Sequence, residues 1–320
     1  IGGFLLTAVG CLLFYPAAGS HSYPTFLGAL FILASGVTLL QVAGNPYVTL
    51  LAKPGKESAT LTLVQAFNSL GTTIAPQIGA FLILADATQT ASKAEQISSV
   101  QIPYLGLAGL LIILAVFVKM IPEEESEHNH DGKSSVWQYK HLVLGAAGIF
   151  CYVGAEVSIG SLMVNVLGLL KGMDHASAAQ YLSFYWGGAM VGRFLGSAVM
   201  AKIAPNRYLA FNATIAVVLL IIAMMTGKGN ADVAMWSLLA IGFFNSIMFP
   251  TIFSLATKNL GKFTNAASGV LCTAIVGGAI VPVVQGWAVD TYSLMSSFVV
   301  SAVCYLYIVF FALKGYKADE

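Results

Sequence analysis

The sequence predicts an all-α membrane protein. Of its 320 residues, 58% are hydrophobic and 9% are charged, whereas a soluble globular chain carries roughly 25% charged residues. A water-soluble fold of this size would lack the polar surface to cover so many apolar side chains. The apolar residues also form long continuous runs, which favour spanning helices over the short alternating strands of a membrane barrel. We therefore expect most of the chain to lie in a lipid bilayer.

Ten apolar runs approach or exceed the length of about 20 residues that a spanning helix needs. Several runs are longer, which predicts tilted helices or helices that continue beyond the bilayer. The predicted spans cover residues 1–17, 24–52, 59–85, 102–121, 139–170, 178–203, 208–227, 231–257, 264–289 and 291–314.

One polar insertion divides these spans into four and six. Residues 122–138 are acidic and contain serine and histidine, so we interpret them as a solvated linker. The linker separates a predicted N-terminal bundle, residues 1–121, from a predicted C-terminal bundle, residues 139–320. A surface loop is the interpretation we adopt for the linker, and a metal site is the alternative for His128, His130 and Asp131.

Positive charge is distributed unevenly between the two sets of loops. Cytoplasmic loops carry an excess of lysine and arginine, so we predict that both chain ends and the linker face the cytoplasm. The eleven residues of the predicted cytoplasmic set are Lys53, Lys56, Lys119, Lys133, Lys140, Lys202, Arg207, Lys258, Lys262, Lys314 and Lys317, and the three of the opposite set are Lys93, Lys171 and Lys228.

Two pairs of spans show a weak internal similarity. Residues 44–79 and 248–282 each contain a proline near an aromatic helix end, a short basic loop, a span with polar residues and a second proline. The two pairs have the same orientation, which is typical of duplicated transporters. Chance similarity between apolar helices is the alternative.

Polar side chains lie inside the second and third predicted spans. Gln65, Asn68, Ser69 and Thr72 form a polar stripe on one helical face, and Gln41 and Asn45 share a face of the span before. Amides both donate and accept hydrogen bonds, which suits the hydroxyl groups of a sugar. The two interpretations are a polar cavity and bridges between helices, and the stripe favours the cavity.

Glu156 is the only carboxylate near the middle of an apolar run. A charge at that depth is costly and calls for a function or a partner. Glu156 is therefore a candidate to bind a proton, to hold Na⁺, to contact sugar or to pair permanently with Arg193. On a straight helix it points away from Ser158, and Gly154 and Gly160 offer a bend that would bring the two together.

Three further residues are weaker candidates. Arg193 lies nine residues before Lys202, and we interpret it as a structural charge that holds the end of a neighbouring helix. Asn245 and Phe249 are four residues apart in the eighth predicted span. The amide would hydrogen-bond a sugar, and the ring would stack on its apolar face.

Five segments together resemble a known family. They are GNPYVTLLA, LVQAFNSLGTTIAP, FCYVGAEVSIGS, GRFLGS and FPTIFSLATKNLG, and they resemble the fucose–galactose–glucose symporter family of the major facilitator superfamily. The resemblance runs along the whole chain and implies twelve spans in two bundles of six, with sugar bound between them. It also implies that residue 1 lies in the family's third span, so we expect the 320 residues alone not to transport.

The resemblance also assigns individual residues. Gln65 and Asn68 match the glutamine and asparagine that contact sugar in the family. Gln41 replaces a glutamate of the fucose permease branch, and a glutamine cannot carry a proton. Glu156 replaces a glutamine of that branch, and its surroundings look like the glucose/galactose branch. The resemblance therefore implies uptake of glucose or galactose with H⁺ or Na⁺, and L-fucose:proton symport is the alternative.

The sequence gives little evidence for other functional classes. The sequence has no Gly-x-Ser-x-Gly, His-Glu-x-x-His or Gly-rich Lys-Ser/Thr motif, so we expect neither an enzyme nor a bound cofactor. The net charge of +1 predicts no nucleic-acid partner. A channel or a non-transporting protein on the same fold remains an alternative. We expect a monomer in the bacterial inner membrane.

Overall fold

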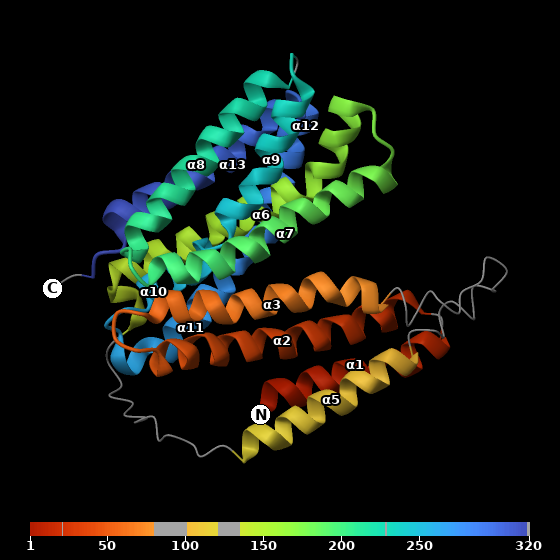
Figure 1. The fold of residues 1–320 in the computed structure, drawn as a ribbon. Helices are drawn as coiled ribbons and strands as arrows, with labels where there is room; N and C mark the ends of the chain where they lie inside the picture. Colours follow the sequence, from red (N-terminus) through yellow and green to blue (C-terminus); the bar gives the residue numbers. More distant parts are fainter. Residues whose placement is uncertain (21, 80–100, 121–134, 228, 319–320) are drawn as a thin grey trace. The chain divides into compact units, whose positions relative to one another are not determined.

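A computed structural model describes residues 1–20, 22–79, 101–120, 135–227 and 229–318 (Figure 1). Every regular element in these residues is helical, which confirms the predicted all-α class. The end of the third predicted span and most of the linker, with His128, His130 and Asp131, lie outside the described residues, so the metal-site alternative stays untested.

The four predicted N-terminal spans correspond to four described helices. Long apolar sequence and few helix-breaking residues explain their length, and Pro46 is accommodated inside the second helix without a break. The helices are α1 (Gly2–Ser20), α2 (Tyr23–Leu51), α3 (Glu57–Gly79) and α5 (Gln101–Lys119).

The six predicted C-terminal spans are also helical, and three of them are irregular. The span at 231–257 divides into α9 and α10, and the span at 264–289 divides into α11 and α12 around a short 3₁₀ turn. A π-helical turn ends the last span. The helices are α6 (Lys140–Lys171), α7 (His175–Met200), α8 (Pro205–Thr226), α9 (Ala231–Asn245), α10 (Met248–Ala256), α11 (Thr264–Thr273), α12 (Gly277–Thr291) and α13 (Val299–Phe310).

Eight helical stretches of the described chain are long and apolar enough to cross a membrane. The two predicted spans outside this group are α3 and α7, which have 23 and 26 residues and are therefore long enough. They carry the amide stripe and Arg193, which lower their apolarity. The long helices agree with the predicted membrane fold.

The chain forms two compact units, each with its own packing. The first unit covers residues 1–44 and 71–129, and the second covers residues 45–70 and 130–320. The predicted bundles at 1–121 and 139–320 remain a prediction.

Glycine allows close packing between α1 and α2 in the first unit. A Cβ atom on Gly10 would lie 2.5 Å from the Leu33 backbone, and one on Gly36 would lie 2.4 Å from the Thr7 nitrogen. Phe14 is 1% exposed, and its ring packs edge-on against the Phe26 ring, with 4.7 Å between the two ring centres. Helix pairs in membranes approach closely through such small residues.

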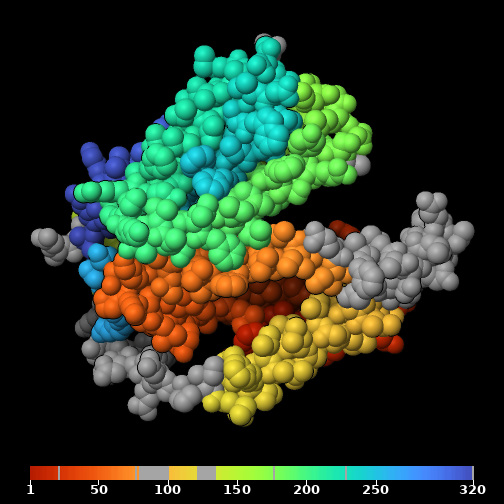
Figure 2. All heavy atoms as spheres, viewed as in Figure 1, coloured from red at the N-terminus to blue at the C-terminus, as the bar shows by residue number. Residues whose placement is uncertain are grey.

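The second unit is built around α6, which packs against α7, α10, α12 and α13. Helices α7 and α9 also lie close together, because a Cβ on Gly242 would lie 2.1 Å from the Tyr185 carbonyl oxygen. The first half of α3 belongs to the same unit, and the space-filling view shows it directly against α7 (Figure 2). Ser197 Oγ donates to the Ala59 carbonyl at 2.9 Å across this contact.

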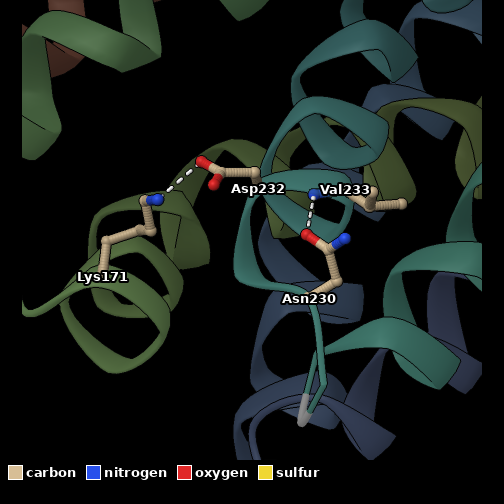
Figure 3. Close-up of polar contacts among 4 residues, drawn as sticks. All are labelled: Lys171, Asn230, Asp232 and Val233. Atoms are coloured by element: carbon tan, nitrogen blue, oxygen red, sulfur yellow. Dashed lines mark hydrogen bonds and ion pairs between the residues drawn. The ribbon is translucent and has the colours of Figure 1, made fainter.

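An ion pair joins the end of α6 to the start of α9 (Figure 3). Lys171 Nζ lies 2.5 Å from Asp232 Oδ1, and the two side chains are 28% and 64% exposed. Asn230 caps α9, because its Oδ1 accepts a hydrogen bond of 3.2 Å from the Val233 nitrogen. The cap satisfies a helix donor, whereas the exposed ion pair is screened by solvent.

These two contacts should differ in their contribution to stability. We expect Asp232→Asn to lower the free energy of unfolding by less than about 1 kcal/mol, and Asn230→Ala by about 1 kcal/mol. The midpoint of thermal unfolding in one detergent measures both. A larger loss for Asp232→Asn than for Asn230→Ala would contradict the expectation.

Candidate functional site

Three amide side chains of α2 and α3 are hydrogen bonded in series. Asn68 Nδ2 donates to Gln65 Oε1 at 3.3 Å, and Gln65 Nε2 donates to Asn45 Oδ1 at 3.3 Å. Asn45 is 6% exposed, and its Nδ2 has no hydrogen-bond partner in the described residues. Buried polar atoms usually find a partner. The series therefore ends in a buried donor without a partner in the described residues.

The structure thus brings together three of the predicted sugar-binding residues. Gln65 is half-buried and Asn68 is exposed, so the series runs from an accessible end to a buried one. Gln41 lies one turn before Asn45 on α2 and is exposed. These positions fit a lining role, and sugar binding by all four residues stays a prediction.

Arg193 connects α7 to two neighbouring helices of the same unit. Its Nε donates to the Ser246 carbonyl at 3.1 Å, and its Nη1 donates to Ser69 Oγ. Ser246 directly follows α9, so the guanidinium lies where the helix dipole favours positive charge. This contact supports the predicted structural role of Arg193 at a helix end.

Glu156 is half-buried on α6 and accepts a hydrogen bond from Tyr152. The Tyr152 hydroxyl lies 2.6 Å from Glu156 Oε1, a short distance that is typical of a charge-assisted bond. The second carboxylate oxygen, Oε2, has no hydrogen bond within the described residues. Arg193 lies within electrostatic range but forms no ion pair with Glu156 in the described chain. A permanent pair between these two residues is therefore not found here.

The structure shows no contact between Glu156 and Ser158. Helix α6 continues without interruption through Gly154 and Gly160. Gly154 serves packing instead, because a Cβ there would lie 2.4 Å from Val281 Cγ2. Ser158 is 1% exposed, and its Oγ has no partner in the described residues. The structure gives no support to a shared ion site of Glu156 and Ser158.

Asn245 is fully buried, and both ends of its amide are occupied. Its Nδ2 donates to the Tyr185 hydroxyl at 2.8 Å, and its Oδ1 accepts from the Tyr305 hydroxyl at 2.7 Å. Each of the two atoms keeps capacity for a second hydrogen bond, but the residue is 0% exposed, so a sugar could reach it only if neighbouring side chains moved. Direct sugar binding by Asn245 stays a prediction, and the arrangement favours a supporting role.

Phe249 lies at the start of α10, close to the Glu156 region. Its ring centre is 6.5 Å from that of Tyr152, and the side chain is half-buried. An aromatic ring suits the apolar face of a sugar, and the neighbouring Tyr152 donates to the Glu156 carboxylate. Stacking by Phe249 stays a prediction that this position supports.

Sequence reasoning missed three tyrosines at this site, Tyr152, Tyr185 and Tyr305. In an apolar run a tyrosine is read as one more aromatic core residue. One signal was available, because Tyr152 and Glu156 are four residues apart and share a helical face. The links to Tyr185 and Tyr305 depend on contacts between distant helices.

Comparison with known proteins places this chain in a family. Residues 1–275 match the family model of the Major Facilitator Superfamily. The glucose/galactose transporter of Brucella abortus biovar 1 (strain 9-941) is 52% identical over 323 residues, which cover 99% of this chain and 77% of the relative. The L-fucose-proton symporter of Escherichia coli (strain K12) is 32% identical over 338 residues, covering 98% of this chain and 76% of the symporter.

A solved structure shows the same fold. The crystal structure of FucP, a Major Facilitator Superfamily transporter in the outward conformation, matches with a TM-score of 0.87 and 31% identity. The match covers 97% of this chain and 81% of FucP. The chain therefore belongs to the major facilitator superfamily, in the branch of the fucose–galactose–glucose symporters.

Proposed function

We propose that this protein is a secondary active transporter that takes up a hexose, glucose or galactose, together with H⁺ or Na⁺ by alternating access. The observation that carries the proposal is the amide series of Asn45, Gln65 and Asn68, which is accessible at its Asn68 end. Donors and acceptors in a low-dielectric site suit a neutral, hydroxyl-rich solute. The name of the 52% identical relative supports glucose or galactose.

Uptake and exchange of labelled sugars test this function. Proteoliposomes that contain the intact protein should show counterflow of glucose and galactose, and accumulation when a cation gradient is imposed. Passive leakage without counterflow would favour a channel, and binding without transport would favour a non-transporting protein. Labelled L-fucose belongs in the same series, because the 32% identical relative is an L-fucose-proton symporter.

Sugar recognition is assigned first to Gln65 and Asn68, with Asn45, Gln41 and Phe249 as further lining residues. Gln65 is central because it bonds to both neighbouring amides. Its removal would leave Asn45 Oδ1 and Asn68 Nδ2 unpaired as well as any sugar hydroxyl that it binds.

Substitution of the two amides should weaken sugar binding. Asn68→Ala removes one neutral hydrogen bond and should cost about 0.5–1.5 kcal/mol, and Gln65→Ala should cost about 1–3 kcal/mol because partners are left unsatisfied. Sugar affinity measured by calorimetry in detergent checks both values.

Thr214→Val is a matched control for these variants. Its hydroxyl bonds only to the Ala210 carbonyl of its own helix, at 2.8 Å, and the side chain is exposed. It should bind sugar like the parent. If Gln65→Ala and Asn68→Ala also bind like the parent, the amide series is helix packing and the assigned site is wrong.

Energy coupling is assigned to Glu156. Gln41 cannot take up or release a proton, whereas Glu156 is a carboxylate with one oxygen free of protein hydrogen bonds in the described residues. Such a group binds H⁺ directly or provides a ligand to Na⁺. Arg193 is assigned to structure, because both of its observed hydrogen bonds hold neighbouring helices.

Orientation, location and assembly complete the proposal. The eleven-to-three distribution of lysine and arginine among the loops supports cytoplasmic chain ends and a cytoplasmic segment 122–138. The bacterial relatives support an inner-membrane location. We propose a monomer in the bilayer, built on a twelve-span fold like that expected for its family.

A further inference from the structure

Glu156 is held by two tyrosines at two different atoms. The Tyr152 hydroxyl donates to the carboxylate at 2.6 Å, and the Tyr185 hydroxyl donates to the main-chain carbonyl of the same residue at 3.2 Å. Both tyrosines are at most 1% exposed. Tyr152 comes from α6 itself and Tyr185 from α7. The side chain and the backbone of Glu156 are therefore fixed independently.

Tyr185 is itself fixed by a second pair of hydrogen bonds. Asn245 Nδ2 donates to the Tyr185 hydroxyl at 2.8 Å, and the Tyr305 hydroxyl donates to Asn245 Oδ1 at 2.7 Å. The donors thus run in one direction, from Tyr305 through Asn245 and Tyr185 to the Glu156 carbonyl. The series joins α13, α9, α7 and α6 in one unit, and its three side chains are fully buried.

Packing alone does not require these hydroxyl groups. Phenylalanine would fill the same space without a buried polar atom that needs a partner. Tyr307 provides a comparison, because its hydroxyl donates to the Leu144 carbonyl at 3.0 Å between α13 and α6, away from Glu156. The other hydroxyl groups converge on Glu156, the carboxylate farthest from the helix ends in the described chain.

The Tyr152 hydrogen bond uses only one of the two carboxylate oxygens of Glu156. Tyr152 donates to Oε1, whereas Oε2 has no hydrogen bond in the described residues, and the side chain is half-buried. Arg193 on α7 acts on the carboxylate only through space. A carboxylate held in this way presents a single oxygen in a defined direction.

We propose that Tyr152 and Tyr185 are positioning residues for the coupling carboxylate, and that Asn245 and Tyr305 hold Tyr185 in place. The inference rests on the proposed role of Glu156. Tyr152 directs Oε2 toward the cation, and Tyr185 stops the helix turn that carries Glu156 from shifting. Without these bonds the carboxylate remains but is not aligned, so sugar movement continues while its coupling to the cation is lost.

Four single-hydroxyl variants test the proposal in one series. They are Tyr152→Phe, Tyr185→Phe, Tyr305→Phe and the control Tyr307→Phe, each made in the intact protein and reconstituted in proteoliposomes. Two quantities are measured on each, namely sugar accumulation under an imposed cation gradient and the rate of counterflow. Exchange needs no net cation movement, so counterflow separates coupling from sugar binding and folding.

We expect accumulation to fall about tenfold for Tyr152→Phe and Tyr185→Phe, since a hydrogen bond to a charged or otherwise unsatisfied group is worth about that factor. Counterflow should stay within about twofold of the parent, because the amide series is untouched. Tyr305→Phe should show a smaller loss, because Tyr185 keeps its bonds to Asn245 and Glu156. Tyr307→Phe should behave like the parent in both measurements.

Three results would overturn the proposal. If Tyr152→Phe and Tyr185→Phe accumulate sugar like Tyr307→Phe, the tyrosines do not position Glu156, and Glu156→Gln in the same series still reports on coupling. If counterflow falls together with accumulation in Tyr152→Phe, Tyr185→Phe and the milder Tyr305→Phe, the hydroxyl groups serve structure. If Glu156→Gln accumulates sugar normally, the coupling role of Glu156 and this inference both fail.

Discussion

Replacement of Glu156 by glutamine is expected to abolish uphill sugar uptake and to leave sugar exchange intact. Glutamine keeps the size of the side chain but cannot bind a proton, and it is a poor substitute for a carboxylate ligand of Na⁺. Exchange moves sugar in both directions without net cation movement, so it does not need the charge. The measurement is accumulation against counterflow in the same proteoliposomes.

Asp290→Asn is the matched control for this variant. Asp290 is an exposed carboxylate near the end of α12, so its neutralisation should leave both measurements unchanged. Glu156 would not be the coupling residue if Glu156→Gln still concentrated sugar like the parent. Loss of both accumulation and counterflow would instead indicate that Glu156 contacts the sugar directly.

Gly242→Ala should cause the largest loss of stability among the variants considered. The added Cβ would lie 2.1 Å from the Tyr185 carbonyl oxygen, and a backbone atom cannot move without its helix. Helices α7 and α9 must separate, which should cost about 3 kcal/mol, the upper part of the usual range for overpacking. The midpoint of thermal unfolding in detergent measures the loss.

Gly286→Ala controls for the intrinsic preference of helices for alanine. Gly286 lies inside α12, and a Cβ at this position meets no atom within 4 Å. The substitution should be neutral or stabilising by up to about 1 kcal/mol. Equal unfolding midpoints for the two alanine variants would show that α7 and α9 do not pack as closely as described.

The positions of the helices were predictable because they follow from local properties. Apolar length determines where a span lies, and each predicted span from 1–17 to 291–314 contains a described helix. The break between α9 and α10 has a local cause in Pro250, whose nitrogen cannot donate to the Ser246 carbonyl four residues earlier. The partner that this freed carbonyl finds was not predictable, because it comes from another helix. Arg193 of α7 donates to the Ser246 carbonyl at the break, whereas Pro46 inside α2 causes no break.

In the candidate site, too, the contacts within one helix were predictable and the contacts between helices were not. Spacing along one helix placed Gln65 and Asn68 on one face, and their hydrogen bond follows from that spacing. The bond from Gln65 to Asn45 joins two helices. The amide side chains made such a bond possible, but the sequence did not predict this pairing. Asn245 was predicted to face sugar, yet two buried tyrosines occupy its amide. Only packing between distant spans determines which partner a buried amide finds.

The low apolarity of α3 and α7 has a consequence for how the protein is made. A nascent helix leaves the translocation channel for lipid when its own hydrophobicity is sufficient. An arginine inside it opposes this, by roughly 2.5–3.5 kcal/mol at the helix centre and by less toward an end. Helix α7 carries Arg193, and its neighbours α6 and α8 are both apolar enough to span alone. We therefore expect α7 to enter the bilayer together with these neighbours, and its biogenesis to fail if either neighbour is replaced by a polar segment.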